Sequence, residues 1–202
     1  MTEKDTQAKL IESATSLFAQ RGYAAVSIRE LADAAQVNSA LISYHFGSKE
    51  GLYLAVLENQ FRPITGLLQQ AAKTAMSPEE RIVYYAKGVY EIHKSRPFLI
   101  RFLHSELTNP TAGLESVVKR YIGQIYPFLY QAFAEGVASR QFNAALNPGY
   151  AVLSLVGIMN FYFIAKPIAR EFLTVDNEHD KKYLLQAVQI YLHGIKDNNY
   201  NS

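Results

Sequence analysis

Cysteine is absent from this 202-residue chain, and proline and glycine are sparse, with seven and eleven residues. The absence of cysteine excludes disulfide bonds, thiolate metal sites and cysteine nucleophiles, and it fits a reducing compartment. No stretch shows the sustained polar–apolar alternation of a half-buried strand. We therefore expect an all-α protein in the cytoplasm.

A strong excess of charge of one sign is also missing. The net charge is only +2, and residues 1–62 hold six Lys and Arg against seven Asp and Glu. A nucleic-acid-binding protein usually shows a cluster of basic residues. Composition alone therefore does not indicate DNA binding, and such a function must rest on a motif.

Leader peptides and long apolar runs are not evident either. The opening MTEKDTQAKL has charges and no apolar run, which predicts no signal peptide. Residues 141–165 carry no charge, but only about sixteen positions are strongly apolar, where a membrane-spanning helix needs about twenty. We expect a helix buried on nearly all sides, in a core or a subunit interface, and no membrane partner.

Apolar residues recur at helical spacing along almost the whole chain. Capping boxes at Ser27–Glu30 and Ser77–Glu80 mark two helix starts. Asn38, Ser48 and Asn147 can cap three others. The sequence thus predicts about nine helices. One ends near Gly22, and the others lie near residues 27–35, 38–44, 48–72, 77–95, 97–108, 114–140, 148–165 and 180–196.

Two prolines fall within or near the later helices. Pro127 is expected to bend the helix at 114–140, because proline removes a backbone donor and crowds the preceding turn. For the same reason Pro167 is expected to bend or end the apolar helix that starts near residue 148.

Residues 27–50, SIRELADAAQVNSALISYHFGSKE, predict two short helices joined at Gln36-Val37. Small residues at Ala32, Ala34 and Ala35 would let the helices approach closely. This is helix-turn-helix geometry, in which the second helix presents its N-terminal residues to the major groove of DNA.

The second helix of this pair would expose a short polar face. A hydroxyl, an imidazole and an ammonium at its end can reach phosphate. The candidate DNA contacts are Ser27, Arg29, Asn38, Ser39, Ala40, Ser43, Tyr44, His45 and Lys49. The alternative is a plain helical hairpin with Tyr44 and Phe46 as core residues, and we assign Phe46 to the core in either case.

This region resembles the TetR family of one-component transcriptional regulators. The matching strings are RGY at the end of the first helix, then SIRELA, VNSALISYHF and GSKEGL, within about residues 8–55. The resemblance implies a dimeric DNA-binding protein whose helical C-terminal part senses a small molecule. It implies backbone contacts at Ser27, Ser39, Tyr44, His45 and Lys49, and base contacts at Ala40 and Ser43. We expect a DNA-binding domain at 1–50 and a ligand-binding and dimerisation domain at 51–202.

Two positions depart from the family pattern. Gln36 stands where the family usually has a turn glycine, and it would be strained if a positive φ is needed there. Ser43 stands where the family usually has tyrosine, which removes a usual DNA contact. Residues 101–111, RFLHSELTNPT, resemble the CecR subgroup, in which an Arg-Glu pair precedes Pro-Thr; here Ser105 replaces the arginine and Glu106 remains.

Two titratable residues fall on apolar helix faces in the second half of the chain, Glu106 and His93. A carboxylate in such a place must be paired, hydrogen-bonded or protonated. Our hypothesis is that both are polar groups of an aromatic-lined pocket for a partly apolar or aromatic effector. The alternative is that each is satisfied separately in the core. The candidate ligand contacts are Tyr85, His93, Phe102, Glu106, Tyr126 and Phe161.

Signatures of catalysis are missing. The chain has no phosphate-binding glycine loop, no G-x-S-x-G and no H-E-x-x-H, and its five histidines form no i, i+4 pair. We therefore predict no catalytic residue, no metal site and no cofactor. A small hydrolytic enzyme using His93 and Glu106 is the enzymatic alternative.

Helices 148–165 and 180–196 are apolar over broad arcs and contain Gly157 and Gly194. Two such helices from each subunit would form a four-helix bundle, and the dimer would bind a palindromic DNA operator. A ligand that favours wrongly spaced recognition helices must weaken DNA binding. This predicts a homodimeric repressor released by its effector. The competing class is a ligand-binding helical protein with a vestigial DNA-binding unit.

Overall fold

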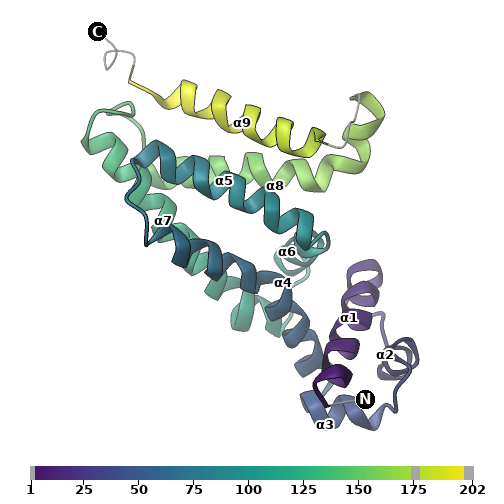
Figure 1. The fold of residues 1–202 in the computed structure, drawn as a ribbon. Helices are drawn as coiled ribbons and strands as arrows, with labels where there is room; N and C mark the ends of the chain where they lie inside the picture. The colour runs from purple at the N-terminus through teal and green to yellow at the C-terminus, as the bar shows by residue number, and fades with distance from the viewer. Residues whose placement is uncertain (1–2, 174–177, 198–202) are drawn as a thin grey trace. The chain divides into compact units, whose positions relative to one another are not determined.

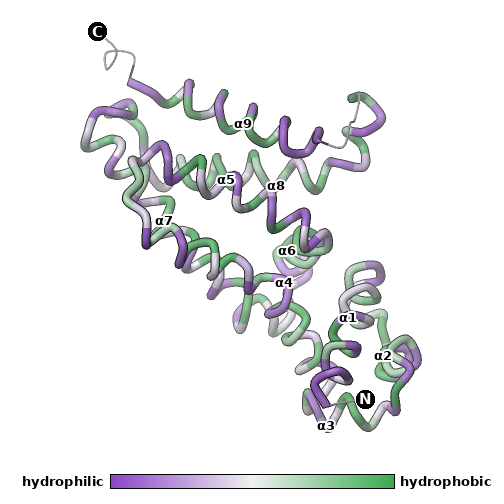
Figure 2. The backbone as a smooth tube through the Cα atoms, in the orientation of Figure 1, coloured by the Kyte–Doolittle hydropathy of each residue, from purple (hydrophilic) through white to green (hydrophobic). Residues whose placement is uncertain are grey.

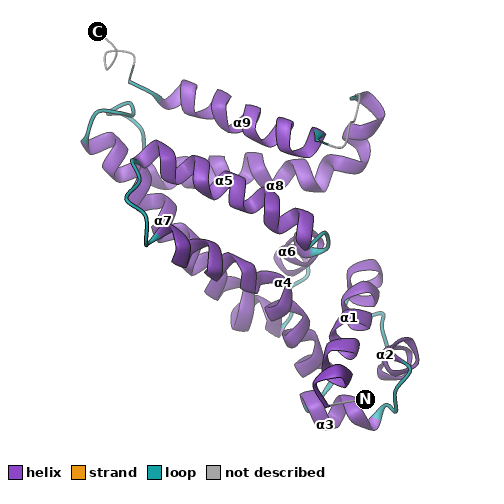
Figure 3. Ribbon diagram, viewed as in Figure 1, coloured by secondary structure: helices purple, strands orange, loops and turns teal. Residues whose placement is uncertain are grey.

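The computed structural model describes residues 3–173 and 178–197. Within these ranges the chain forms nine α-helices and one short π-helical segment, with no strand, so the prediction of an all-α fold with about nine helices is confirmed (Figures 1 and 3). The helices are α1 (Glu3–Arg21), α2 (Ile28–Ala35), α3 (Ala40–Phe46), α4 (Lys49–Ala71), α5 (Pro78–Ser95), α6 (Leu99–Thr108), α7 (Lys119–Ala138), α8 (Pro148–Phe172) and α9 (His179–Ile195), and the π-helical segment η1 is Leu114–Val118.

The predicted caps are present at the helix starts. Before α2, the Ser27 side chain accepts from the Glu30 backbone N–H, and the Ser27 backbone N–H donates to the Glu30 carboxylate at 2.8 Å. Ser77 and Glu80 form the same reciprocal pair before α5. The other predicted caps also accept backbone N–H groups, at Asn38, Ser48 and Asn147. These side chains satisfy donors that the first helical turn leaves free.

Prolines inside helices account for the main differences from the predicted boundaries. Pro127 lies inside α7, as expected. Pro167 does not end α8, which runs on to Phe172, so the ending near residue 165 was wrong. Pro63 lies inside α4, which matches the helix predicted over residues 48–72. A helix can continue through proline when neighbouring packing offsets the lost backbone bond.

The described chain forms two compact units. The first unit contains residues 3–63 and 96–121, and the second contains the described residues of 64–95, 122–173 and 178–197. The segment that carries α6 and η1 therefore packs with the N-terminal helices, although it is distant from them in sequence. The predicted functional boundary at residue 50 stays a prediction.

The core of the first unit joins α1, α2, α3 and the beginning of α4. Leu10, Leu31 and Ile42 are fully buried or nearly so. Phe18 of α1 meets Tyr53 of α4 edge-on, with ring centres 5.0 Å apart. Burying side chains of this size stabilises a fold by roughly 1.5–3 kcal/mol each. The core therefore fixes α3 on the α1–α4 scaffold.

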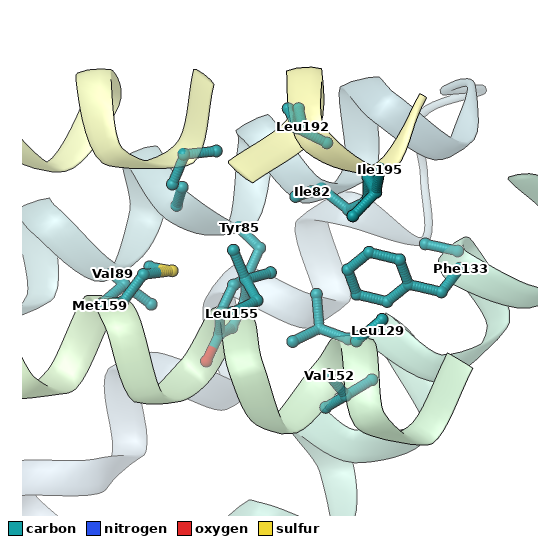
Figure 4. Close-up of a cluster of buried hydrophobic side chains, with 14 of the residues drawn as sticks. Ile82, Tyr85, Val89, Leu129, Phe133, Val152, Leu155, Met159, Leu192 and Ile195 are labelled. Carbon is teal, nitrogen blue, oxygen red and sulfur yellow. The ribbon is translucent and has the colours of Figure 1, made fainter. Parts of the chain in front are cut away.

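The second unit has its own core, formed by α5, α7, α8 and α9. Figure 1 shows α5, α8 and α9 running side by side, in agreement with their packing contacts. Figure 4 shows side chains from all four helices meeting between them, with Phe133 and Leu155 fully buried. The labelled members are Ile82, Tyr85, Val89, Leu129, Phe133, Val152, Leu155, Met159, Leu192 and Ile195.

Helix α8 is long and apolar enough to cross a membrane by length and composition, and 28% of its most apolar window is buried within the chain. Figure 2 shows it as a largely hydrophobic helix. One face packs into the second core through residues such as Leu155, while Tyr150, Leu153, Phe161 and Phe172 are exposed. The expected burial on nearly all sides is therefore wrong within one chain, because only one face of α8 meets its neighbours.

Candidate nucleic-acid interface

The α2–α3 turn is built on a left-handed residue. Gln36 has φ 55° and ψ 46°, and the Val37 backbone N–H donates to the Ala32 carbonyl oxygen at 3.0 Å. This αL ending satisfies carbonyl groups at the end of α2. The positive φ that sequence analysis associated with strain is therefore present at Gln36.

Helix α3 has one buried face and one exposed face. Ile42 is fully buried, whereas Ser39, Ala40 and Ser43 are exposed. Tyr44 is 73% exposed, so the alternative in which it is a core residue is wrong. Phe46 is half-buried. The short exposed residues at the start of α3 leave the backbone accessible, as contact with base edges requires.

The candidate residues on either side of α3 differ in whether their side chains already have partners within the protein. Arg29 and Asn38 are exposed. Ser27 is exposed too, but its hydroxyl already bonds the Glu30 carboxylate at 2.7 Å. Bonds from Ser27 and from Arg21, 2.6 Å away, lower the pKa of Glu30 to about 2. The charge of this acidic residue is thus paired locally, and α3 itself carries no acidic residue.

His45 and Lys49 have partners within the protein. The His45 side chain is only 3% exposed, and its Nδ1 lies 3.4 Å from Gln7 Nε2 and 3.8 Å from a Glu3 carboxylate oxygen. Its ring is thus turned toward α1, which the sequence pattern did not predict. Lys49 Nζ lies 4.4 Å from the centre of the Tyr23 ring, which is a cation–π contact.

Among the candidate ligand residues, Phe102 and Glu106 belong to the first unit, and both are buried. The Glu106 carboxylate accepts from the Tyr53 hydroxyl at 2.6 Å, the Thr111 hydroxyl at 2.9 Å and the Thr111 backbone N–H at 3.1 Å. The sequence pattern did not predict Tyr53 as a partner of Glu106. The Thr111 contact falls within the CecR-like segment, so the Pro-Thr after Glu106 was a usable signal.

Tyr85 and His93 belong to the second unit and are buried. The His93 ring stacks on Phe163 with centres 3.8 Å apart. Burial lowers the pKa of His93 to about 4, against the opposing effect of a hydrogen bond with Asn160. His93 and Glu106 thus have separate partners, and a shared pocket stays a prediction.

Two other candidate ligand residues are on the surface of the second unit. Tyr126 and Phe161 are both exposed, and Tyr126 stacks on Tyr130 with centres 5.7 Å apart. Neither residue lines the groove or the apolar hollow of this unit described next.

The described residues of the second unit surround an open groove and an apolar hollow. An open groove of about 780 Å³ lies among α4, α5 and α9, and an almost wholly apolar hollow of about 470 Å³ lies on α8 and α9. The groove is lined by Leu67, Tyr84, Lys87, Gly88, Tyr90, Glu91, Ile92, Lys181 and Leu185. No group of three or more potential metal ligands occurs in the part of the chain that the structure describes.

Comparison with known proteins agrees with this geometry. Residues 10–56, which contain the α2–α3 pair, match the family of bacterial regulatory proteins named tetR. The probable HTH-type transcriptional regulator YttP of Bacillus subtilis is 24% identical over 194 residues, covering 94% of this chain and 93% of YttP. The HTH-type transcriptional dual regulator CecR of Shigella flexneri is 32% identical over 149 residues, 66% of each chain.

The fold has a close structural counterpart. The ketosteroid transcriptional regulator KstR2 of Mycobacterium tuberculosis superposes with a TM-score of 0.79 and 18% identity, covering 95% of both chains. The counterpart extends over the helices beyond the helix-turn-helix, so the likeness concerns the whole fold. The chain belongs to the tetR family of bacterial regulatory proteins and is a DNA-binding transcriptional regulator.

Proposed function

We propose that the protein is a homodimeric repressor that binds a palindromic operator and leaves it when a small-molecule effector binds. The observation that carries the DNA-binding part is the exposed face of α3. Its start is polar, and Tyr44 presents a hydroxyl at its end while 73% exposed. A tyrosine this exposed contributes little to the core, and a phosphate contact gives its hydroxyl a role.

The proposed DNA contacts follow their placement in the structure. Ala40 and Ser43 face the bases, and Ser39, Tyr44 and Lys49 face the DNA backbone. Arg29 and Asn38 are exposed and can reach phosphate beside them. Ser27 and His45 already have partners within the protein. They can contact DNA without losing these partners only through atoms that are not yet hydrogen-bonded. We therefore place them at the margin of the interface.

The dimer is proposed through α8 and α9. Their exposed apolar side chains and the hollow between them form a surface suited to a second copy. Monomeric proteins rarely expose large contiguous apolar patches, and such patches mark interaction sites. The same surface explains the apolar composition of α8 without a membrane, and a regulator of chromosomal DNA acts in the cytoplasm.

The effector is proposed to be partly apolar or aromatic, because the groove among α4, α5 and α9 has mostly apolar walls and two lysines at its margin. Its volume is in the range of small-molecule sites. Tyr85 and His93 lie on α5, which forms part of its wall, and remain candidates for effector response. We propose no catalytic role for Glu106, since its carboxylate is occupied by Tyr53 and Thr111.

A single substitution tests the DNA-binding proposal. Tyr44→Ala should raise the Kd for a cognate duplex by at least about tenfold when both proteins are measured at the same salt concentration. The substitution removes a phosphate contact and a rigid side chain. Fluorescence anisotropy with labelled duplex measures this. Tyr130→Ala is the matched control, an exposed tyrosine on α7 that should leave the Kd unchanged. Equal affinity of wild type and Tyr44→Ala would contradict the proposed interface.

A further inference from the structure

Glu106 is a fully buried carboxylate at the C-terminal end of α6, with 0% exposure. Three donors satisfy it, the Tyr53 hydroxyl and the hydroxyl and backbone N–H of Thr111. A buried carboxylate without such donors is strongly unfavourable. This hydrogen bonding therefore fixes the position of the hydroxyl group of Tyr53, a residue of α4.

The Tyr53 ring lies between α6 and the N-terminal helices. Its centre is 5.0 Å from that of Phe18 in α1 and 4.8 Å from that of Tyr23 in the loop before α2. Burial and the Glu106 charge raise the pKa of Tyr53, so its hydroxyl remains a proton donor. Both ends of this side chain are thus held, the ring by aromatic neighbours and the hydroxyl by Glu106.

Besides Tyr53, the Tyr23 ring also contacts Lys49. The Lys49 ammonium lies 4.4 Å from the Tyr23 ring centre, at the first turn of α4 and directly after the recognition helix. A lysine side chain is flexible, and an aromatic platform restricts it at little cost in hydration. The Tyr23 ring therefore restricts the ammonium of Lys49, the first residue of α4.

We propose that Glu106 and Tyr53 are positioning residues for DNA binding. Glu106 fixes the Tyr53 ring, Tyr53 supports Tyr23, and Tyr23 holds the Lys49 ammonium for a phosphate of the operator. Helix α6 is then part of the DNA-binding apparatus, although it lies outside residues 10–56, which carry the family match. This inference rests on the proposed phosphate contact of Lys49.

The series of contacts from Glu106 through Tyr53 and Tyr23 to Lys49 is called the relay below. The salt dependence of operator binding tests it. Each lost phosphate contact lowers the slope of log K against log salt by about 0.9, and it raises Kd about fivefold per bound subunit at roughly 0.15 M salt. Lys49→Ala should show this change. Tyr53→Phe, which removes only a hydroxyl, should reproduce at least half of it, and the double variant should match Lys49→Ala alone. The full-length chain and one selected duplex are used throughout.

Two further variants separate positioning from folding. Tyr121→Phe removes a similar hydroxyl–carboxylate bond, 2.7 Å to Glu58 of α4, but does not touch the relay, so its salt slope should equal that of wild type. Glu106→Gln keeps an oxygen for the Tyr53 hydroxyl and should retain most of the slope. Thermal unfolding of each variant establishes that it is folded at the temperature of the binding assay.

The outcomes are distinct. A normal slope in Tyr53→Phe beside a reduced slope in Lys49→Ala overturns the relay, and so does strict additivity in the double variant. An unchanged slope in Lys49→Ala overturns it as well, because the cation would then not contact phosphate, while operator binding itself stands. Failure of the folded wild type to select any duplex would instead overturn the proposed function.

Discussion

At the residue scale, Gln36 is a strained position in the turn between α2 and α3, because it is a non-glycine residue at φ 55°. Placing an L-residue in the left-handed region costs roughly 1–2 kcal/mol of folding free energy, and glycine avoids this cost. Glycine, however, loses more conformational entropy on folding, which reduces the gain by about 0.5–1 kcal/mol. Gln36→Gly should therefore stabilise the protein by roughly 0.5–1 kcal/mol. A higher urea midpoint with unchanged slope measures this, and Gln36→Ala should show no such gain. A lower midpoint for Gln36→Gly would contradict the account of the turn.

His93 gives a pH prediction at the same scale. Its folded-state pKa is about 4, below an unfolded value of about 6.5. The unfolded state therefore binds more protons in this window, so the contribution is fully present above pH 6.5 and is lost as pH falls toward 4. The loss is on the order of 3 kcal/mol.

Denaturation across pH 4–7.5, compared between wild type and His93→Asn, isolates this contribution, because other acid effects are shared. The wild type should lose more stability on acidification than the variant. Parallel pH profiles would show that the His93 imidazole is protonated as easily in the folded state as in the unfolded one.

Single residues also show how far sequence analysis reached. The caps at Ser27 and Asn147 were predictable because their hydrogen bonds are local. The burial of Glu106 followed from its place on an apolar face. The partnership with Tyr53 spans 53 residues, and the inward turn of His45 toward Gln7 spans 38. Neither has a local sequence signal, so both required the structure.

At the element scale, periodicity located the helices but not everything about them. The π-helical segment at Leu114–Val118 and the grouping of α6 with the N-terminal helices depend on packing between distant segments. The apolar run of α8 was recognised, yet periodicity could not say which face the chain itself covers. Which face of α8 is buried depends on which neighbouring helices pack against it in the fold.

The exposed face of α8 yields the prediction for this scale. Leu153→Asp should convert the dimer to monomer at micromolar concentration, because Leu153 is 74% exposed in the single chain and a charge there would be buried without a partner in the dimer. Sedimentation velocity measures the mass. Gln131→Glu, at an exposed position of α7, should leave the dimer intact. A dimer that survives Leu153→Asp would place the interface elsewhere.

At the scale of the whole molecule, the two-unit organisation serves a regulator. The first unit contains the recognition helix together with α6, and the second contains the groove and the exposed apolar face. Reciprocal linkage requires that an effector which weakens operator binding is itself bound less tightly by the operator complex. The fold and the helix-turn-helix were predictable from the sequence, whereas the effector was not, because exposed and buried aromatic residues have the same helical spacing.

The most direct test of the central claim is selection of bound sequences from random duplex DNA, at stated salt, with wild type and Tyr44→Ala in parallel. Wild type should enrich a palindrome whose half-sites lie about one helical turn or a multiple apart, and Tyr44→Ala should lose that enrichment. No enriched sequence from a folded wild-type dimer would contradict the claim that this chain is a sequence-specific regulator.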